Sequence, residues 1–181
     1  MTCLDNIKRI QGYLDNHGLK YETHLEGEEG EFDYLGEEEG CIVIINPGND
    51  QCIYIDVSYD NYTLTFGGAH AHYDWDEEKN YENMMEDLIS LLESKLGAAT
   101  LLLGGKEWYG AGFHSKEDIS KGNANELFWD VLEIKEFARE IADKGGVVEC
   151  CFWDASLDRT MQIDTELVKA DLSAGKCTRE H

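Results

Sequence analysis

Residues 41–68, CIVIINPGNDQCIYIDVSYDNYTLTFGG, carry the pattern that decides the fold. Three runs of β-branched and aromatic residues are separated by turn-forming residues at 46–50 and 60–61. Connections this short favour antiparallel pairing, so the stretch predicts a three-stranded meander. Side chains alternate along a strand, which places Ile53, Ile55 and Val57 on one face. We expect that face to look into the core.

An amphipathic helix is predicted on each side of this meander. Upstream, Thr2 suits an N-cap with Asp5 three residues later, and Gly18 follows the last helical residue. The apolar positions of this first helix are Leu4, Ile7, Ile10 and Leu14. Downstream, apolar residues follow helical spacing from Tyr81 to Leu96, before Gly97.

The second half of the chain alternates the two periodicities. Residues 98–114 predict two strands joined at 104–106, and 115–126 reads as a polar loop. A helix is expected before Gly145, with 127–132 suiting either a strand or its first turn. Residues 146–156 and 159–167 predict a last strand pair, and the tail 168–181 is expected to fray. We therefore predict a single α+β domain over 1–181: an antiparallel sheet of six to eight strands with helices packed mainly on one face.

Charge sets the first limit on function. The chain has 38 acidic and 15 basic residues, for a formal net charge of −23. Nucleic acids and anionic membranes are polyanions, so direct binding to either is not expected. The charge favours either simple solubility or a basic protein partner.

The cysteines and the hydropathy pattern favour the cytoplasm. The six cysteines form no Cys-x-x-Cys pair and no zinc-finger spacing, and adjacent Cys150 and Cys151 sit in an apolar run. We therefore expect reduced thiols in a strand core. No segment has the roughly 20 apolar residues needed to span a bilayer, and the start of the chain has no signal-peptide pattern.

A strongly acidic run lies between the first helix and the meander. Residues 22–39 contain nine acidic side chains and no lysine or arginine; Glu28, Glu29, Glu37, Glu38 and Glu39 are the candidate contacts for a partner. The run suits an acidic docking surface. The pattern favours, over that surface, an edge hairpin whose charges discourage pairing with another chain.

Residues 64–78, LTFGGAHAHYDWDEE, concentrate possible chemistry. On a strand, His70 and His72 share a face, with Cα atoms about 7 Å apart, a spacing that lets two imidazoles hold one zinc ion. A third ligand would have to come from elsewhere; Asp74, His24, His114, Asp56 and Cys52 are the candidates. Structural or partner contacts are the other roles open to the pair. Asp74 and Glu77 also form a capping box, which favours starting a helix over binding metal.

Four tryptophans are the remaining unusual feature. Buried packing is the general expectation for Trp108, Trp129 and Trp153. Trp75 is the exception, because Asp76 and Glu77 follow closely. An exposed indole beside acids is typical of a contact with a basic partner.

The segments LTFGGAHAHYD and KEWYGAGF, with an amphipathic helix and a strand between them, carry a resemblance. From Tyr62 to about Asp118 the chain resembles small uncharacterised bacterial proteins, some of which are similar to immunity proteins of polymorphic toxin systems. Those proteins often have an aromatic residue where this chain has Ala69. The resemblance implies a cytosolic protein that binds and neutralises a partner, and it implies no catalytic residue.

Three functions follow as hypotheses. The first is an acidic binding protein, needing no cofactor, that occludes a basic toxin such as a nuclease by electrostatic steering and aromatic contacts. The second is a metal-dependent hydrolase with His70 and His72 as zinc ligands and a nearby carboxylate as general base. The third is a structural or homodimeric protein. Metal content separates the second from the others, and a sizing measurement tests the third.

Overall fold

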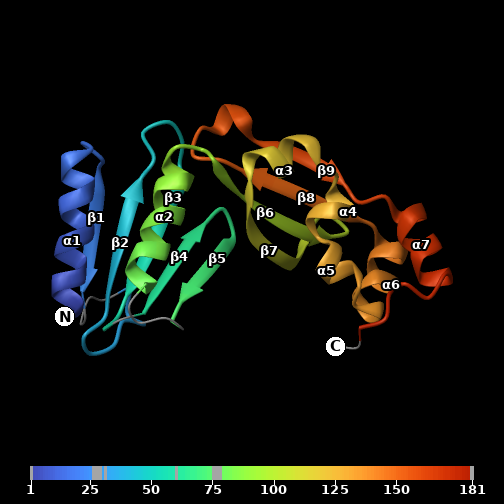
Figure 1. The fold of residues 1–181 in the computed structure, drawn as a ribbon, viewed down its shortest axis with the longest axis horizontal. Helices are drawn as coiled ribbons and strands as arrows, with labels where there is room; N and C mark the ends of the chain where they lie inside the picture. Colours follow the sequence, from blue (N-terminus) through green and yellow to red (C-terminus); the bar gives the residue numbers. More distant parts are fainter. Residues whose placement is uncertain (1, 26–29, 31, 60, 75–78, 180–181) are drawn as a thin grey trace. The chain divides into compact units, whose positions relative to one another are not determined.

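The computed structural model describes residues 2–25, 30, 32–59, 61–74 and 79–179. Its contacts divide the chain into two compact units, unit 1 (1–93) and unit 2 (94–181) (Figure 1). Each unit pairs antiparallel strands with helices, which confirms the α+β class. The strands form two sheets, of five and four strands, instead of one sheet of six to eight. A division by contacts does not tell whether the two units unfold together as one domain, so the single domain stays a prediction.

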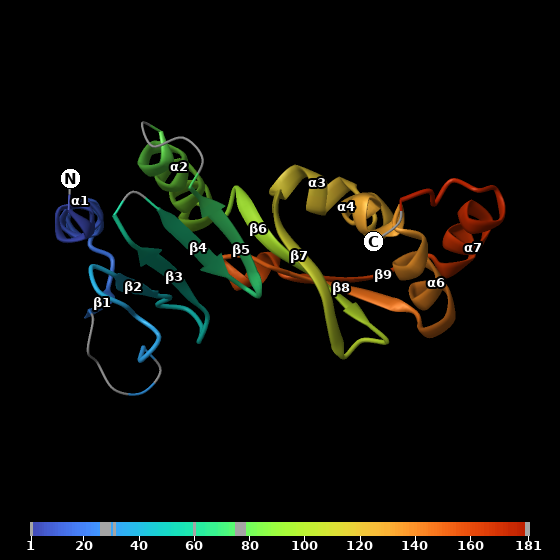
Figure 2. The same cartoon turned by 90° about the horizontal axis from the view of Figure 1, so that it is seen from below.

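Unit 1 is a five-stranded meander in sequence order, β1-β2-β3-β4-β5. The strands are β1 (Tyr21–Leu25), β2 (Gly40–Ile45), β3 (Cys52–Val57), β4 (Tyr62–Phe66) and β5 (Ala69–Tyr73). The helices α1 (Cys3–Asn16) and α2 (Asn80–Leu92) lie on the same face of this sheet (Figure 2). The predicted face of β3 is buried beneath them, with Ile53, Ile55 and Val57 at most 1% exposed.

The first helix begins as its sequence predicts. The Thr2 hydroxyl accepts a hydrogen bond from the Asp5 backbone N–H at 3.2 Å, and the Asp5 carboxylate accepts from the Thr2 N–H at 3.0 Å. This capping box satisfies two N–H groups that the first turn leaves without partners. One prediction for this helix is wrong: Leu4 is 51% exposed, because the core stripe runs through Cys3, Ile7, Ile10 and Leu14 instead.

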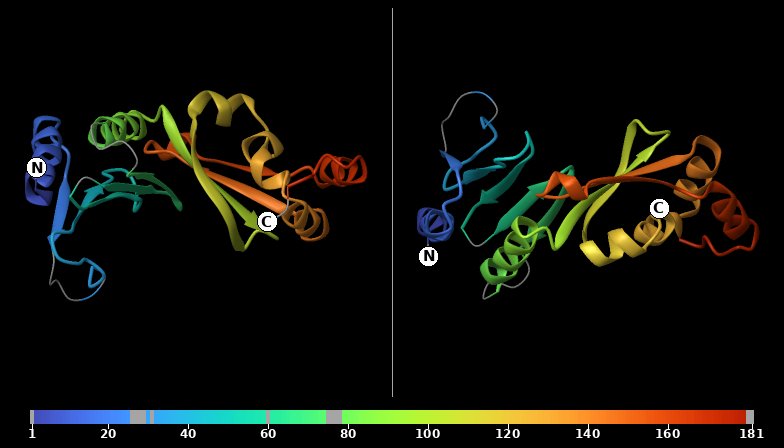
Figure 3. Two further views of the ribbon diagram at one scale, coloured as in Figure 1. Left: turned by 60° about the horizontal axis from the view of Figure 1, so that its bottom comes forward. Right: turned by 90° about the horizontal axis from the view of Figure 1, so that it is seen from above.

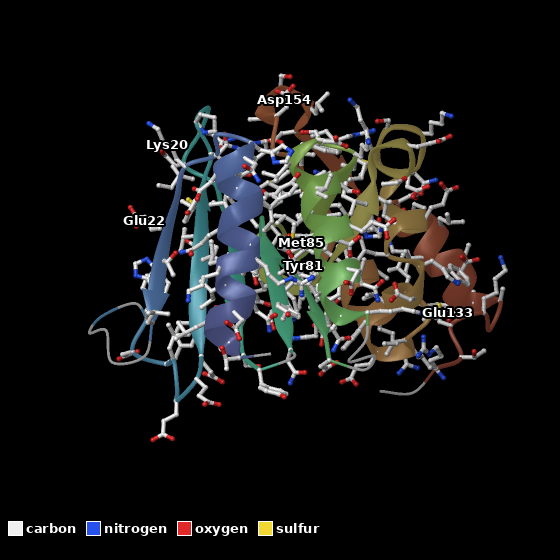
Figure 4. All side chains as sticks on the ribbon, turned by 60° about the vertical axis from the view of Figure 1, so that its left-hand side comes forward. Lys20, Glu22, Tyr81, Met85, Glu133 and Asp154 are labelled. Carbon is white, nitrogen blue, oxygen red and sulfur yellow. The ribbon has the colours of Figure 1, made fainter. Side chains whose placement is uncertain are left out.

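The second helix differs from its prediction at both ends. Its N-cap is Lys79, so Asp74 does not cap it. It ends at Leu92, where Ser94 takes a left-handed φ of 53°, and Leu96 begins the next strand. Tyr81 and Met85 lie one turn apart on the side of α2 toward α1 (Figure 4). The Arg9 guanidinium of α1 lies 3.6 Å from the Tyr81 ring centre and joins the two helices.

Unit 2 has the strand order β7-β6-β8-β9. Its strands are β6 (Leu96–Leu103), β7 (Glu107–Ser115), β8 (Gly146–Cys151) and β9 (Arg159–Gln162). Its helices are α3 (Lys116–Lys121), α4 (Ala124–Leu127), α5 (Trp129–Leu132), α6 (Lys135–Lys144) and α7 (Thr165–Ser173), with a 3₁₀ turn η1 (Ala155–Leu157). Figure 3 shows α3, α4 and α5 against one face of this sheet.

Two predictions for unit 2 are wrong, both because caps were overlooked. The expected polar loop at 115–126 contains α3, whose N-cap hydroxyl is that of Ser115. The tail expected to fray over 168–181 is helical from Thr165 to Ser173, with Asp164 as N-cap and Val168 buried. Later in that tail, the Arg179 carbonyl accepts a hydrogen bond from the Lys135 N–H at 3.0 Å.

Candidate functional site

The face of the unit 1 sheet opposite α1 and α2, here called the open face, is lined with polar side chains. The register aligns His24, Cys41, Asp56, Thr63 and His72 in one row across all five strands. A second row is Glu22, Val43, Tyr54, Thr65 and His70. In Figure 4, Glu22 projects from β1 away from α1. Alternation along each strand produces the rows, because the other residues of each strand face the helices.

His70 and His72 lie at the β5 edge of the open face, and both are exposed. Their ring centres are 5.0 Å apart, with planes at 69°. His72 Nδ1 is 3.0 Å from the Thr63 hydroxyl on β4, which fixes the orientation of that imidazole. The predicted same-face pair therefore exists.

The described residues place no third ligand beside this pair. Asp56 lies two strands from His72, about 10 Å away at the usual strand spacing, and Thr63 lies between them. The Asp56 carboxylate accepts a hydrogen bond from the Tyr34 hydroxyl at 2.8 Å instead. Within the described ranges, no group of three or more His, Cys, Asp or Glu side chains could hold a metal ion. The zinc site stays a prediction with two ligands.

Part of the predicted partner surface lies outside the described residues. Trp75, Asp76, Glu77, Glu28 and Glu29 all fall in the ranges that are not described. The described members are Glu37, Glu38 and Glu39, in the segment that leads into β2. They remain a candidate surface for a basic partner.

The segment 32–39 covers one end of the open face. Leu35, Cys41 and Val43 form a small buried cluster there, against which Phe32 and Tyr54 pack. Phe32 also stacks on His24, with ring centres 3.7 Å apart. Burial and the nearby Asp56 carboxylate raise the pKa of the Cys41 thiol to about 12. The segment is thus anchored by its apolar residues while Glu37 and Glu38 stay exposed.

Charge is divided unequally between the two units. Unit 1 contains 22 acidic and 4 basic residues, a net −18, whereas unit 2 contains 16 acidic and 11 basic residues, a net −5. Several lysines of unit 2 pair with acids on the same helix, such as Lys121 with Glu117 at 2.6 Å and Lys144 with Glu140 at 3.2 Å. Most of the negative potential of the chain therefore belongs to unit 1.

In unit 2, the residues that could suggest a nucleophilic triad have structural roles. The Ser115 hydroxyl donates to the Asp118 carboxylate at 2.6 Å and accepts from the Asp118 N–H at 3.0 Å, as the cap of α3. His114 is partly buried near Phe128, with ring centres 5.9 Å apart, and burial lowers its pKa below 6.5. The Ser115 hydroxyl is thus occupied by capping α3.

Two tryptophans contradict the expectation of burial. Trp108 is 58% exposed at the start of β7, and Trp129 is 48% exposed. Trp129 borders a cavity of about 380 Å³ in unit 2, together with Leu167 and Val168. Sequence reasoning missed this cavity because its lining residues come from α4, α5, α7 and the chain after α7, which no local pattern connects.

The cysteines are only partly as predicted: four lie in strands, whereas Cys3 lies in α1 and Cys177 follows α7. All six are free, and Cys3, Cys41, Cys150 and Cys177 are buried. Burial raises the pKa of Cys150 to about 11, which keeps its thiol protonated and unreactive near neutral pH. Among the helices in the described ranges, none is long and apolar enough to cross a bilayer.

Comparison with known proteins gives no relative from which a function could be transferred. No protein-family model, no curated protein and no solved structure matches the chain.

Proposed function

We propose that the chain is an acidic binding protein that holds a basic protein partner, in the manner of an immunity protein that neutralises a toxin such as a nuclease. The single observation that carries this proposal is the net charge of −18 on unit 1. A charge of this size attracts basic surfaces and accelerates encounter with them. Nucleic acid is also a polyanion, so an acidic protein can compete with the substrate of a nuclease for the enzyme's basic site.

The position of the acidic side chains supports the proposal. Glu37, Glu38 and Glu39 follow a segment that is anchored by a buried apolar cluster, so they are presented from a supported backbone. We keep Trp75, Asp76, Glu77, Glu28 and Glu29 as further proposed contacts. The six free thiols agree with a reducing cytoplasm, where an immunity protein of a bacterium would act.

The test begins with the gene next to the one that encodes this chain. The proposal expects it to encode a large secreted protein with a basic C-terminal domain. That C-terminal domain is expressed in a bacterial host with and without this chain, and growth is measured. Growth arrest that co-expression relieves is the expected result. Continued arrest in the presence of the soluble chain would count against the proposal.

Salt dependence provides the mechanistic control. The association rate of the two purified proteins is measured by stopped flow from 20 to 500 mM NaCl. Because attraction between exposed charges is screened over about 10 Å at 0.1 M salt, we expect the rate to fall at least tenfold across the series. A rate that does not change with salt would show that the charge of unit 1 does not drive association.

A further inference from the structure

A cavity of about 420 Å³ opens at one end of unit 1. The start of α1, the end of β1 and the start of β2 come together at that end (Figure 1). The cavity is lined by Thr2, Cys3, Leu4, Leu25, Glu38 and Glu39. We call this cavity the α1–β1 socket. The volume is within the range that encloses a small ligand or one long side chain.

The socket has an apolar wall that faces solvent. Leu4 is 51% exposed and Leu25 is 38% exposed, although α1 buries its other apolar side chains, Cys3, Ile7, Ile10 and Leu14. Gly40 is paired with Leu25, and a Cβ atom at this position would lie 2.7 Å from Ile7 Cδ1 and 3.1 Å from Leu25 Cδ2. Because residue 40 is a glycine, the side chains of Ile7 and Leu25 can pack closely against its backbone.

The socket is also lined by acidic side chains. Glu38 is exposed and takes a left-handed backbone conformation, with φ 61°, while the Glu39 carboxylate accepts a hydrogen bond from the Gly36 N–H at 2.8 Å. The field of both carboxylates reaches Cys3, where burial first and then these two charges raise the pKa of the thiol. Apolar and anionic groups thus line a single cavity.

We propose that the α1–β1 socket receives an arginine or lysine side chain of the basic partner. This inference rests on the proposed function and names the contact by which that partner is held. The aliphatic stem of such a side chain would lie against Leu4 and Leu25, and its cationic head would reach the carboxylates of Glu38 and Glu39.

Charge selects this occupant over a second copy of the chain. A second copy would bring its own unit 1, with a net charge of −18, against the same acidic wall. A purely apolar ligand would leave both carboxylates desolvated without a counter-charge, which is costly. A cation on an aliphatic stem can pack against the leucines and neutralise the glutamates of the socket.

The test is an NMR titration of the full ¹⁵N-labelled chain with acetyl-(Gly-Arg)₃-amide and acetyl-(Gly-Lys)₃-amide at 20 mM NaCl, with acetyl-(Gly-Glu)₃-amide as control. The expected result is a set of saturable shifts centred on the amides of residues 2–4, 25 and 38–40, with the basic peptides only. Saturation by one basic peptide at lower concentration identifies the preferred head group.

Two variants locate the contact. Leu25→Ala and Glu38→Gln change exposed side chains, and each is expected to weaken peptide binding about two- to fivefold. Matched controls are Leu167→Ala, a leucine of similar exposure in unit 2, and Glu86→Gln, an exposed glutamate on α2; both should leave the affinity unchanged.

The outcomes separate this inference from the proposed function. Basic peptides that shift other parts of unit 1, with affinities unaffected by Leu25→Ala and Glu38→Gln, overturn the socket and leave the proposed function standing. No shift anywhere in unit 1 overturns the socket, while relief of growth arrest by co-expression still decides the function. Concentration-dependent self-association that Leu25→Ala removes would show that the socket holds a second copy instead.

Discussion

Unit 1 and unit 2 share one architecture and differ in charge. Each is an antiparallel sheet with helices against one face, but unit 1 carries a net −18 and unit 2 a net −5. In unit 2, acidic side chains pair with lysines one turn away, as Glu117 does with Lys121. In unit 1 only four basic residues are present to balance 22 acids.

The comparison shows that core packing and surface charge are specified separately. Both sheets bury one face against helices by the same alternation of side chains, and this burial stabilises each unit whatever its charge. Self-repulsion on unit 1 opposes its compact state. The proposed function assigns this excess of acids, which stability does not require, a role in binding.

The largest expected effect concerns whether the two units unfold together. Ile55→Ala in unit 1 and Leu101→Ala in unit 2 each remove a completely buried side chain, so each should lower the free energy of unfolding by about 3 kcal/mol. Urea unfolding is followed by tryptophan fluorescence, since three of the four tryptophans lie in unit 2. A single domain requires Ile55→Ala to shift this signal as far as Leu101→Ala does. A urea midpoint by fluorescence that is unchanged by Ile55→Ala would show that the two units unfold independently.

Substituting one closely packed glycine in each unit should lower the free energy of unfolding by a smaller amount, and the loss should be larger in unit 2. A Cβ at Gly97 would lie 2.8 Å from the Phe152 ring and 3.0 Å from a backbone oxygen. A Cβ at Gly40 would lie 2.7 Å and 3.1 Å from the flexible ends of Ile7 and Leu25, and 3.2 Å from a backbone oxygen, so its closest contacts can move more easily. We expect Gly97→Ala to cost about 2–3 kcal/mol and Gly40→Ala about 1 kcal/mol, as crowding of a packed core does. Thermal unfolding measures both, and a larger loss for Gly40→Ala would contradict the packing described for unit 1.

Neutralising acidic side chains should weaken the binding of a basic peptide more in unit 1 than in unit 2. Replacing Glu37, Glu38 and Glu39 with Gln in unit 1 should weaken binding of acetyl-(Gly-Arg)₃-amide about tenfold at 20 mM NaCl, because three charges at or near the surface together contribute about 1.4 kcal/mol. The same exchange at Glu107, Glu136 and Glu149, which are exposed in unit 2, should change it less than twofold. Titration calorimetry gives both values. Equal losses would mean that net charge alone matters, without regard to its position.

The smallest effect is a pH dependence that belongs to unit 2. Burial lowers the pKa of His114 below 6.5, with Asp118 and Asp130 opposing the shift, so the unfolded chain binds this proton more tightly. The contribution of His114 to stability is complete above about pH 6.5 and is lost as pH falls through that value toward the lower folded pKa. Urea midpoints at pH 7 and pH 5 should differ less in His114→Gln. His72→Gln, an exposed control in unit 1, should keep the original difference.

Local patterns in the sequence predicted most of the elements. The meander, the Thr2 capping box and the hairpin at 104–106 are all present, because each depends on residues close in the chain. The prediction of one sheet is wrong because strand periodicity does not show where one sheet ends and another begins. The exposed Leu4 was missed for a related reason: Leu4 fits the helical period, and only the placement of the sheet makes Cys3 the buried position.

The candidate site was predicted in composition and only partly in geometry. Alternation correctly placed His70 and His72 on one face. Glu37, Glu38 and Glu39 of the acidic run are exposed or half-exposed, and their contact with a partner stays a prediction. The α1–β1 socket could not be predicted from local sequence patterns, because its lining includes Leu4 and Glu38, which are more than 30 residues apart. The strand register also separates Asp56 from His72, which spacing along the chain does not reveal.

The strand orders have a consequence for how the chain folds during synthesis. Every strand of unit 1 pairs with its neighbour in sequence, so its contact order is low and its hairpins can close as they leave the ribosome. In unit 2, β6 must pair with β8 across the intervening β7 and α3 to α6. We therefore expect the acidic half of the molecule to fold first, while the central pairing of the second sheet waits for nearly fifty further residues.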